Sequence, residues 1–112
     1  MKKPDIFLKH ILESMEAIEK YLKEVTKDNF LHSTQIQDAV VRRLEIIGEA
    51  TKNLPASFKN KYPHIPWRKI AGTRDIIVHE YFGLDLNLVW RITNKDLPEL
   101  KENILKILKE IE

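Results

Sequence analysis

The sequence predicts an all-α protein, an antiparallel bundle of four to five helices, with a single domain over residues 1–112. Three observations support this class. Leu, Ile, Lys and Glu are abundant and only 3 Gly occur in 112 residues, a composition that favours helix. Apolar residues recur at the spacing of helix faces. No segment combines the alternation of a strand with a hairpin turn.

The first predicted helix covers residues 5–27, where apolar side chains share one face at near-helical spacing. Asp28 and Asn29 are expected to end it. The second covers residues 33–54 and begins at Ser or Thr, residue types that cap helices, while Pro55 lies just beyond its end. The residues that follow, punctuated by three Pro, are expected to form an irregular connection or a short helical turn.

The third predicted helix covers residues 66–83, because Pro66 suits a first turn and a Gly stands at the far end. A short fourth helix is expected over 85–93, with Asp85 as its cap. The fifth covers 96–111, where Leu and Ile recur along one face.

Composition also narrows the chemistry and the location. The chain has no Cys, which excludes disulfides, thiol catalysis and Cys-based zinc sites, and fits a reducing compartment. No apolar run has the length of a membrane span or of a signal peptide. We therefore expect a cytoplasmic protein. His10 and Glu13 have an i, i+3 spacing that occurs in metal sites of bundles, but no matching set exists elsewhere, so no metal is expected.

One segment of the chain is strongly basic. Six basic residues and no acidic residue lie between Ala50 and Arg74, interleaved with aromatic rings and a His. Cations next to rings suit single-stranded nucleic acid. The alternative is a solvated loop beside a core Trp. The residues that we expect to contact the nucleic acid are Lys59, Lys61, Arg68 and Lys69.

The stretch of most interest contains Arg74, Asp75, His79 and Tyr81. Arg can clamp a phosphate with paired hydrogen bonds, and His exchanges protons near neutral pH. On an ideal helix Arg74 and His79 lie about 140° apart around the axis, so both can flank one groove although they are not stacked. The spacing alone is also compatible with an Arg paired to an acid and a His bonded to a carbonyl.

Residues 67–85 closely resemble the signature of the HepT-like branch of the HEPN superfamily, the toxin halves of bacterial and archaeal toxin–antitoxin pairs. The family motif is Arg, a polar residue, three variable residues, His, any residue and Tyr, and residues 74–81 match it position by position. The strings at 43–50 and 96–100 are also similar to those of the family. The resemblance therefore spans most of the chain and implies a HEPN-like fold.

The resemblance implies a metal-independent endoribonuclease without a cofactor. His79 would transfer protons, Arg74 would neutralise charge on the phosphoryl oxygens, and Tyr81 would orient the phosphate or the sugar. Transfer RNA and messenger RNA are both plausible substrates. Glu49 could orient Arg74 or His79, or be a solvated surface residue. Many superfamily members have Asn where this chain has Asp75, and an acid there could pair with Arg74 and weaken its attraction for phosphate.

The resemblance also implies partners. One His cannot be base and acid at once, and relatives suggest a two-fold homodimer in which two motifs share one cleft. A minimal nucleotidyltransferase would be the antitoxin, and it would transfer AMP to Tyr81, whose added phosphate charge would repel RNA. The alternative is a non-catalytic helical module that binds the nucleotidyltransferase or a nucleotide, in which Arg74 and His79 have structural roles only.

Overall fold

The computed structural model describes residues 4–79 and 83–111, with the backbone alone at positions 78 and 79. No strand occurs within these two ranges, so the predicted all-α class is confirmed. The helices are α1 (Pro4–Leu22), α2 (Lys27–Leu31), α3 (Thr34–Asn53), α4 (Ala56–Lys59), α5 (Trp67–His79), α6 (Leu86–Arg91) and α7 (Leu97–Ile111), and a π-helical turn (Ile92–Asp96) joins α6 to α7.

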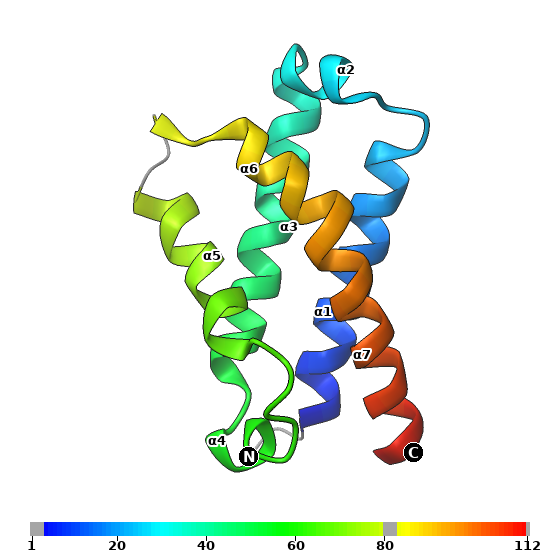
Figure 1. The fold of residues 1–112 in the computed structure, drawn as a ribbon, viewed down its shortest axis with the longest axis vertical. Coiled ribbons are helices and arrows are strands. Elements are labelled where there is room, and N and C mark those ends of the chain that lie inside the picture. Colours follow the sequence, from blue (N-terminus) through cyan, green and yellow to red (C-terminus); the bar gives the residue numbers. More distant parts are fainter. Residues whose placement is uncertain (1–3, 80–82, 112) are drawn as a thin grey trace.

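The long helices form an antiparallel bundle with α3 at its centre (Figure 1). α1 runs towards the end that carries α2, α3 returns, α5 runs up again, and α6 with α7 comes back as one long rod. α3 packs against α1 on one side and against α5 on the other, and α7 packs against α1. The predicted bundle is therefore confirmed, and α5, which carries the family-like motif, has α3 as its main support.

Aliphatic side chains from α1, α3 and α7 fill the core, because each of these helices has its apolar residues on one face. Trp67 at the start of α5 is also buried, as is Val89 of α6. None of the helices in the described ranges is long and apolar enough to cross a membrane. The fully buried side chains of the long helices include Leu8, Ile11, Val40 and Ile104.

The first helix ends earlier than the sequence predicts. α1 stops at Leu22, and Glu24 adopts a left-handed backbone conformation with a φ of 61°. Thr26 then caps the short helix α2 by accepting a hydrogen bond from the Asn29 amide. Asp28 and Asn29, which we expected to break a helix, are thus inside one. The early end of α1 lets the chain turn into α2, which places the Phe30 side chain in the core, where it is fully buried.

The last two predicted helices are not separated by a break. The π-helical turn over Ile92–Asp96 carries the chain from α6 into α7 with helical backbone throughout. Thr93 and Asn94 both donate side-chain hydrogen bonds to the Trp90 carbonyl, at 2.8 and 2.9 Å. The predicted cap at Asp85 is confirmed, since its carboxylate accepts hydrogen bonds from the amides of Asn87 and Leu88.

Candidate active site between α3 and α5

A glycine sets the distance between α3 and α5. Gly48 is buried in the C-terminal half of α3 and faces Arg74 of α5. A Cβ placed on Gly48 would overlap the Arg74 Cβ and would lie 3.2 Å from both the Arg74 Cα and its backbone nitrogen. Only a residue without a side chain permits this approach. The Arg74 side chain therefore starts from a point fixed against α3.

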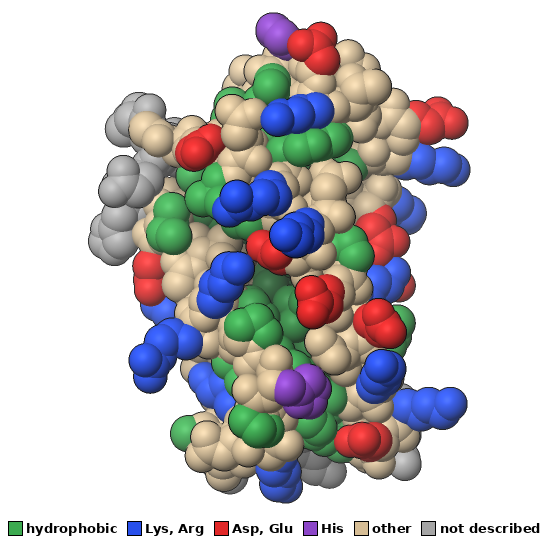
Figure 2. Space-filling model, in the orientation of Figure 1, with side chains coloured by type: hydrophobic (Ala, Val, Ile, Leu, Met, Phe, Trp, Pro, Cys, Tyr) green, Lys and Arg blue, Asp and Glu red, His purple; other side chains and the backbone are tan. Residues whose placement is uncertain are grey.

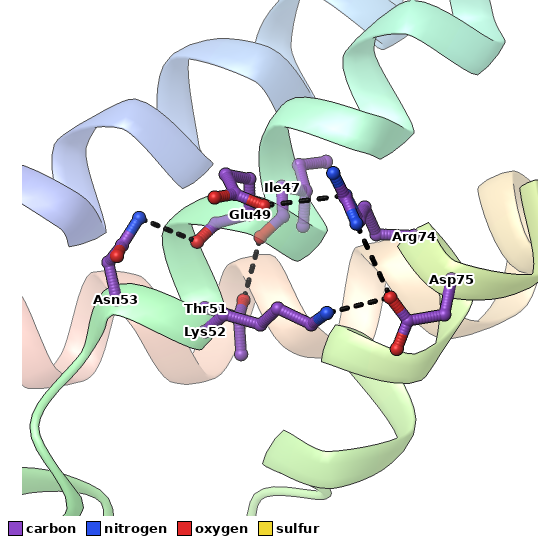
Figure 3. A network of polar contacts seen from close by, with 7 residues as sticks. All are labelled: Ile47, Glu49, Thr51, Lys52, Asn53, Arg74 and Asp75. Atoms are coloured by element: carbon purple, nitrogen blue, oxygen red, sulfur yellow. Dashed lines mark hydrogen bonds and ion pairs between the residues drawn. The ribbon is translucent and has the colours of Figure 1, made fainter. Parts of the chain in front are cut away.

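Two carboxylates orient the Arg74 guanidinium (Figure 3). Its Nε lies 3.4 Å from Glu49 Oε2, and its Nη1 lies 3.5 Å from Asp75 Oδ1. Both distances exceed the roughly 2.7–2.9 Å of a strong charge-assisted hydrogen bond. About a third of the side chain is exposed, 34%. The carboxylates thus direct the guanidinium without closing it to an anion from solvent.

The Asp75 carboxylate lies closer to Lys52 than to Arg74. The Lys52 ammonium donates a hydrogen bond of 2.7 Å to Asp75 Oδ1, the same oxygen that Arg74 approaches (Figure 3). This hydrogen bond is the main reason why the pKa of the Asp75 carboxyl lies below its ordinary value; partial desolvation opposes the shift, and the charges of Lys52 and Arg74 add to it. Asp75 is therefore a carboxylate at neutral pH.

The sequence of α3 explains why Glu49 and Lys52 reach the same place. Residues three apart share a helix face, and the apolar residues Ile47 and Leu44 are buried towards the core. Thr51 is buried too and satisfies its hydroxyl by donating to the Ile47 carbonyl at 2.8 Å. The polar face of α3 therefore meets the start of the motif on α5.

The structure brings together Arg74, Asp75 and Glu49 of the predicted site residues. His79 is the last residue of α5, and its side chain lies outside the described residues, as does all of Tyr81. The convergence of His79 with Arg74 and the role of Tyr81 stay predictions.

The four basic residues predicted to contact RNA come from α4, from the turn after it and from α5. Arg68 and Lys69 are exposed on α5, on the helix that carries Arg74. Lys59 of α4 donates to the Thr51 carbonyl at 3.4 Å, which directs it back to the end of α3. Lys61 lines a separate groove together with residues of α1 and α7. Only the pair on α5 belongs to the same helix as the motif.

The aromatic rings of the basic segment pack on one another. Phe58 and Trp67 are buried, and Phe58 contacts the rings of Tyr62 and Trp67 with centroids 5.3 and 6.3 Å apart. The Trp67 indole donates to the Tyr62 carbonyl at 3.1 Å. The interpretation of a loop beside a core Trp is therefore correct for these two rings, which leave no free face for a base.

An apolar hollow lies on another side of α5 (Figure 2). It has a volume of about 240 Å³ and a floor of hydrophobic side chains, with basic, acidic and His side chains around it. Lys69, Thr73 and Ile76 of α5 line it, whereas Arg74, Asp75 and Glu49 do not. Because the predicted site residues Arg74, Asp75 and Glu49 do not line the hollow, we place the candidate site at the contact between α3 and α5.

The described side chains offer no set of metal ligands. Among the side chains that the structure describes, those of residues 4–77 and 83–111, no group of three His, Asp or Glu could hold an ion. His10 and Glu13 are both exposed on α1, with no third ligand beside them.

Sequence reasoning missed two residues of this site, Gly48 and Lys52. A Gly within a helix costs about 1 kcal/mol relative to Ala and so signals a packing reason. Lys52 follows Glu49 by three residues with the opposite charge, a pattern that marks a paired face. Both signals are present in the sequence, but neither identifies α5 as the partner.

A family model described as "HepT-like: Ribonuclease HepT-like" matches residues 11–107. This chain belongs to the HepT-like ribonuclease family. "Probable ribonuclease HepT" of Thermococcus cleftensis is 44% identical over 103 residues, which cover 92% of this chain and 94% of that protein. "Putative RNase MJ1216" of Methanocaldococcus jannaschii is 45% identical, with 100% and 94% covered.

A longer relative contains a similar segment. "Gamma-glutamylcyclotransferase and putative RNase MJ0434" of Methanocaldococcus jannaschii is 57% identical over 107 residues, 96% of this chain. The chain spans about half the length of that relative, 48%. No solved structure gives a significant match to the chain.

Proposed function

We propose that this chain is a metal-independent endoribonuclease, the toxin of a toxin–antitoxin pair, and that Arg74 and His79 perform the cleavage. The observation that carries the proposal is the Arg74 guanidinium, which is partly exposed and oriented at the contact of α3 with α5. Arg74 lies five residues before His79, which is the last residue of α5. Membership of the HepT-like ribonuclease family supports the same activity.

The proposed reaction uses the RNA's own 2′-hydroxyl. A base removes the proton of that hydroxyl, its oxygen forms a bond to phosphorus, and the bond from phosphorus to the 5′-oxygen breaks as an acid protonates that oxygen. His79 is the proton-transfer group. Arg74 neutralises the charge that grows on the non-bridging oxygens, where a preoriented cation is most effective. The products are a 2′,3′-cyclic phosphate and a 5′-hydroxyl.

A second copy of the chain would complete the site. One imidazole cannot accept the first proton and donate the second at the same instant, so we propose a homodimer in which each protomer supplies one Arg74 and one His79 to a shared cleft. Arg68 and Lys69, exposed on α5, would hold the flanking phosphates of a transfer RNA or messenger RNA. Lys59 and Lys61 are more distant candidates for the same role.

Regulation would act on Tyr81. We propose that a minimal nucleotidyltransferase antitoxin in the cytoplasm transfers AMP from ATP to this hydroxyl, which loses its proton as pyrophosphate leaves. The added phosphate would oppose RNA binding by charge repulsion. Intact mass measurement of the chain after co-expression with a neighbouring nucleotidyltransferase tests this. We expect mass increments of AMP that map to Tyr81. A chain that stays unmodified when it is co-expressed with an active nucleotidyltransferase would contradict the proposal.

RNA cleavage by the unmodified chain in EDTA tests the activity itself. Arg74→Ala should lower the rate by roughly 100- to 1000-fold, the usual cost of one transition-state donor. His79→Ala should lower it by about 100- to 10,000-fold. Arg42→Ala removes an exposed Arg on α3 that has no ion-pair partner in the described ranges, and it should cleave like the parent. Products should end in a cyclic or 3′-phosphate.

Two results would favour the non-catalytic module instead. One is the absence of cleavage by the unmodified parent chain; the other is equal cleavage by the parent and both variants, which would indicate a contaminant. Mixing the Arg74→Ala and His79→Ala proteins tests the shared cleft. Partial recovery of cleavage is expected if two protomers share one cleft, because the mixed dimer restores one Arg74 and one His79 to it, and no recovery would count against the homodimeric site.

A further inference from the structure

The Asp75 carboxylate lies between two cations that compete for one oxygen. Lys52 Nζ is 2.7 Å from Oδ1, and Arg74 Nη1 is 3.5 Å from the same atom. The first distance is that of a strong charge-assisted hydrogen bond, and the second is not. Asp75 is adjacent to Arg74 in the sequence, yet its strong contact is with a residue of another helix (Figure 3).

The two contacts differ in how they are supported. Lys52 belongs to α3, and the close approach at Gly48 fixes α3 against α5. Arg74 also has a second carboxylate at hand, because Glu49 lies 3.4 Å from its Nε. If Asp75 turned fully onto Arg74, the guanidinium would be held by two acids and an incoming phosphate would have to displace both.

We propose that Lys52 is a positioning residue that holds the Asp75 carboxylate away from Arg74, so that the Arg74 guanidinium stays available to a phosphate. The inference rests on the proposed function, in which Arg74 binds the phosphodiester. It also explains how this chain tolerates an acid beside the motif Arg. Lys52 touches no substrate in this role and acts through Asp75 alone.

The charges of the cluster support the inference. Glu49 and Asp75 carry two negative charges, Lys52 and Arg74 carry two positive charges, and the four side chains lie within one set of ion pairs. Removal of Lys52 would leave Arg74 among an excess of negative charge, which repels a phosphate. The lowered pKa of Asp75, caused first by Lys52, is consistent with this arrangement.

Lys52→Met tests the inference in a cleavage assay, because it removes the ammonium and keeps a side chain of similar length. We expect a loss of about tenfold in kcat/KM, within the range for residues of one salt-bridge network. Lys52→Arg should retain most activity. Lys20→Met, which removes an exposed Lys from α1, is the matched control and should behave like the parent. Thermal unfolding of each variant verifies its fold.

The double variant separates positioning from direct RNA contact. If Lys52 acts through Asp75, then Asp75→Asn should remove the need for it, and Lys52→Met should cost nothing further in the D75N background. An equal loss in both backgrounds, with a shallower dependence of RNA binding on salt, would show that Lys52 contacts RNA and would overturn the inference. Unchanged cleavage by Lys52→Met would overturn it as well.

A measurement without RNA distinguishes failure of this inference from failure of the nuclease proposal. The 13C NMR signal of the Asp75 carboxyl should report a higher pKa in Lys52→Met than in the parent. Inorganic phosphate should shift the Arg74 Nε–H signal less in the variant. If the parent cuts no RNA but these shifts are seen, only the nuclease proposal fails; if the shifts are absent, the role of Lys52 is wrong.

Discussion

The two contacts made by α3 are built in opposite ways. Towards α1, its buried residues are aliphatic, and the contact stabilises the fold by removing apolar surface from water. Towards α5, a glycine replaces the side chain at the point of closest approach, and half-exposed charged residues surround it. One face of the helix thus contributes stability through aliphatic burial, and the other fixes the position of Arg74.

A truncation in the apolar contact should have the largest effect on stability. Ile11 of α1 is fully buried. Ile11→Ala should lower the free energy of unfolding by about 2–5 kcal/mol, through lost transfer energy and the cavity that remains. Chemical denaturation measures this loss, and Ile11→Val should cost only about 0.5–1.5 kcal/mol.

Ile11→Ala also tests whether the two faces are independent. RNA cleavage per folded molecule, measured well below the unfolding transition, should match the parent. A large loss of cleavage in fully folded Ile11→Ala protein would show that the core contact sets the geometry of the site, and the distinction between the two faces would then be wrong.

A methyl group added to Gly48, at the contact of α3 with α5, should lower the stability less than Ile11→Ala does and lower the cleavage rate more. Gly48→Ala places a Cβ against the Cα, Cβ and nitrogen of Arg74, so α5 must move. Overpacking of this kind costs about 1–3 kcal/mol. A displacement of about 1 Å can lower an enzymatic rate by roughly 100-fold. Chemical denaturation and RNA cleavage on the same preparation measure both consequences.

Gly72 provides the matched control for Gly48. It lies inside α5, and a Cβ there meets no atom of the described chain within 4 Å. Gly72→Ala should therefore stabilise the protein by about 1 kcal/mol, the difference in helix propensity. If both substitutions destabilise the isolated chain equally, the close approach at Gly48 is not the cause.

The sequence predicts the core contact better than the contact that carries the site. Apolar periodicity identifies the faces of α1, α3 and α7, since burial acts on each helix separately. The early end of α1 is not readable from residues 23–27, which contain neither Gly nor Pro. It accompanies the burial of Phe30 of α2 in the core. The bundle follows from local pattern, whereas its turns follow from tertiary packing.

The candidate site shows the same division. The match to the family motif identifies Arg74 and Asp75, and the similar string at residues 43–50 of the second predicted helix identifies Glu49. Lys52 is not found, because its role depends on which residue of α5 it faces, and that register is set by Gly48. The basic residues predicted to act together lie on different elements, since Lys59 ends α4, Lys61 lies in the turn after it, and Arg68 and Lys69 belong to α5.

The smallest expected effect concerns pH and again separates the two faces of α3. Asp75 has a lowered pKa in the folded chain, so its ionised form stabilises the fold above its ordinary pKa of 3.8, and this contribution is lost as the pH falls through the lowered value. Asp75→Asn should thus be slightly less stable than the parent at pH 7, and the difference should vanish in acid.

Denaturation of the parent and of Asp75→Asn between pH 7 and pH 2 measures this difference. Ile11→Ala, in contrast, should show the same deficit across that range, because no titrating group takes part in an aliphatic contact. High salt should reduce the Asp75 effect at neutral pH, since the carboxylate is 45% exposed and its partners are screened. A deficit for Asp75→Asn that persists in acid would show that packing, rather than charge, holds this part of α5 against α3.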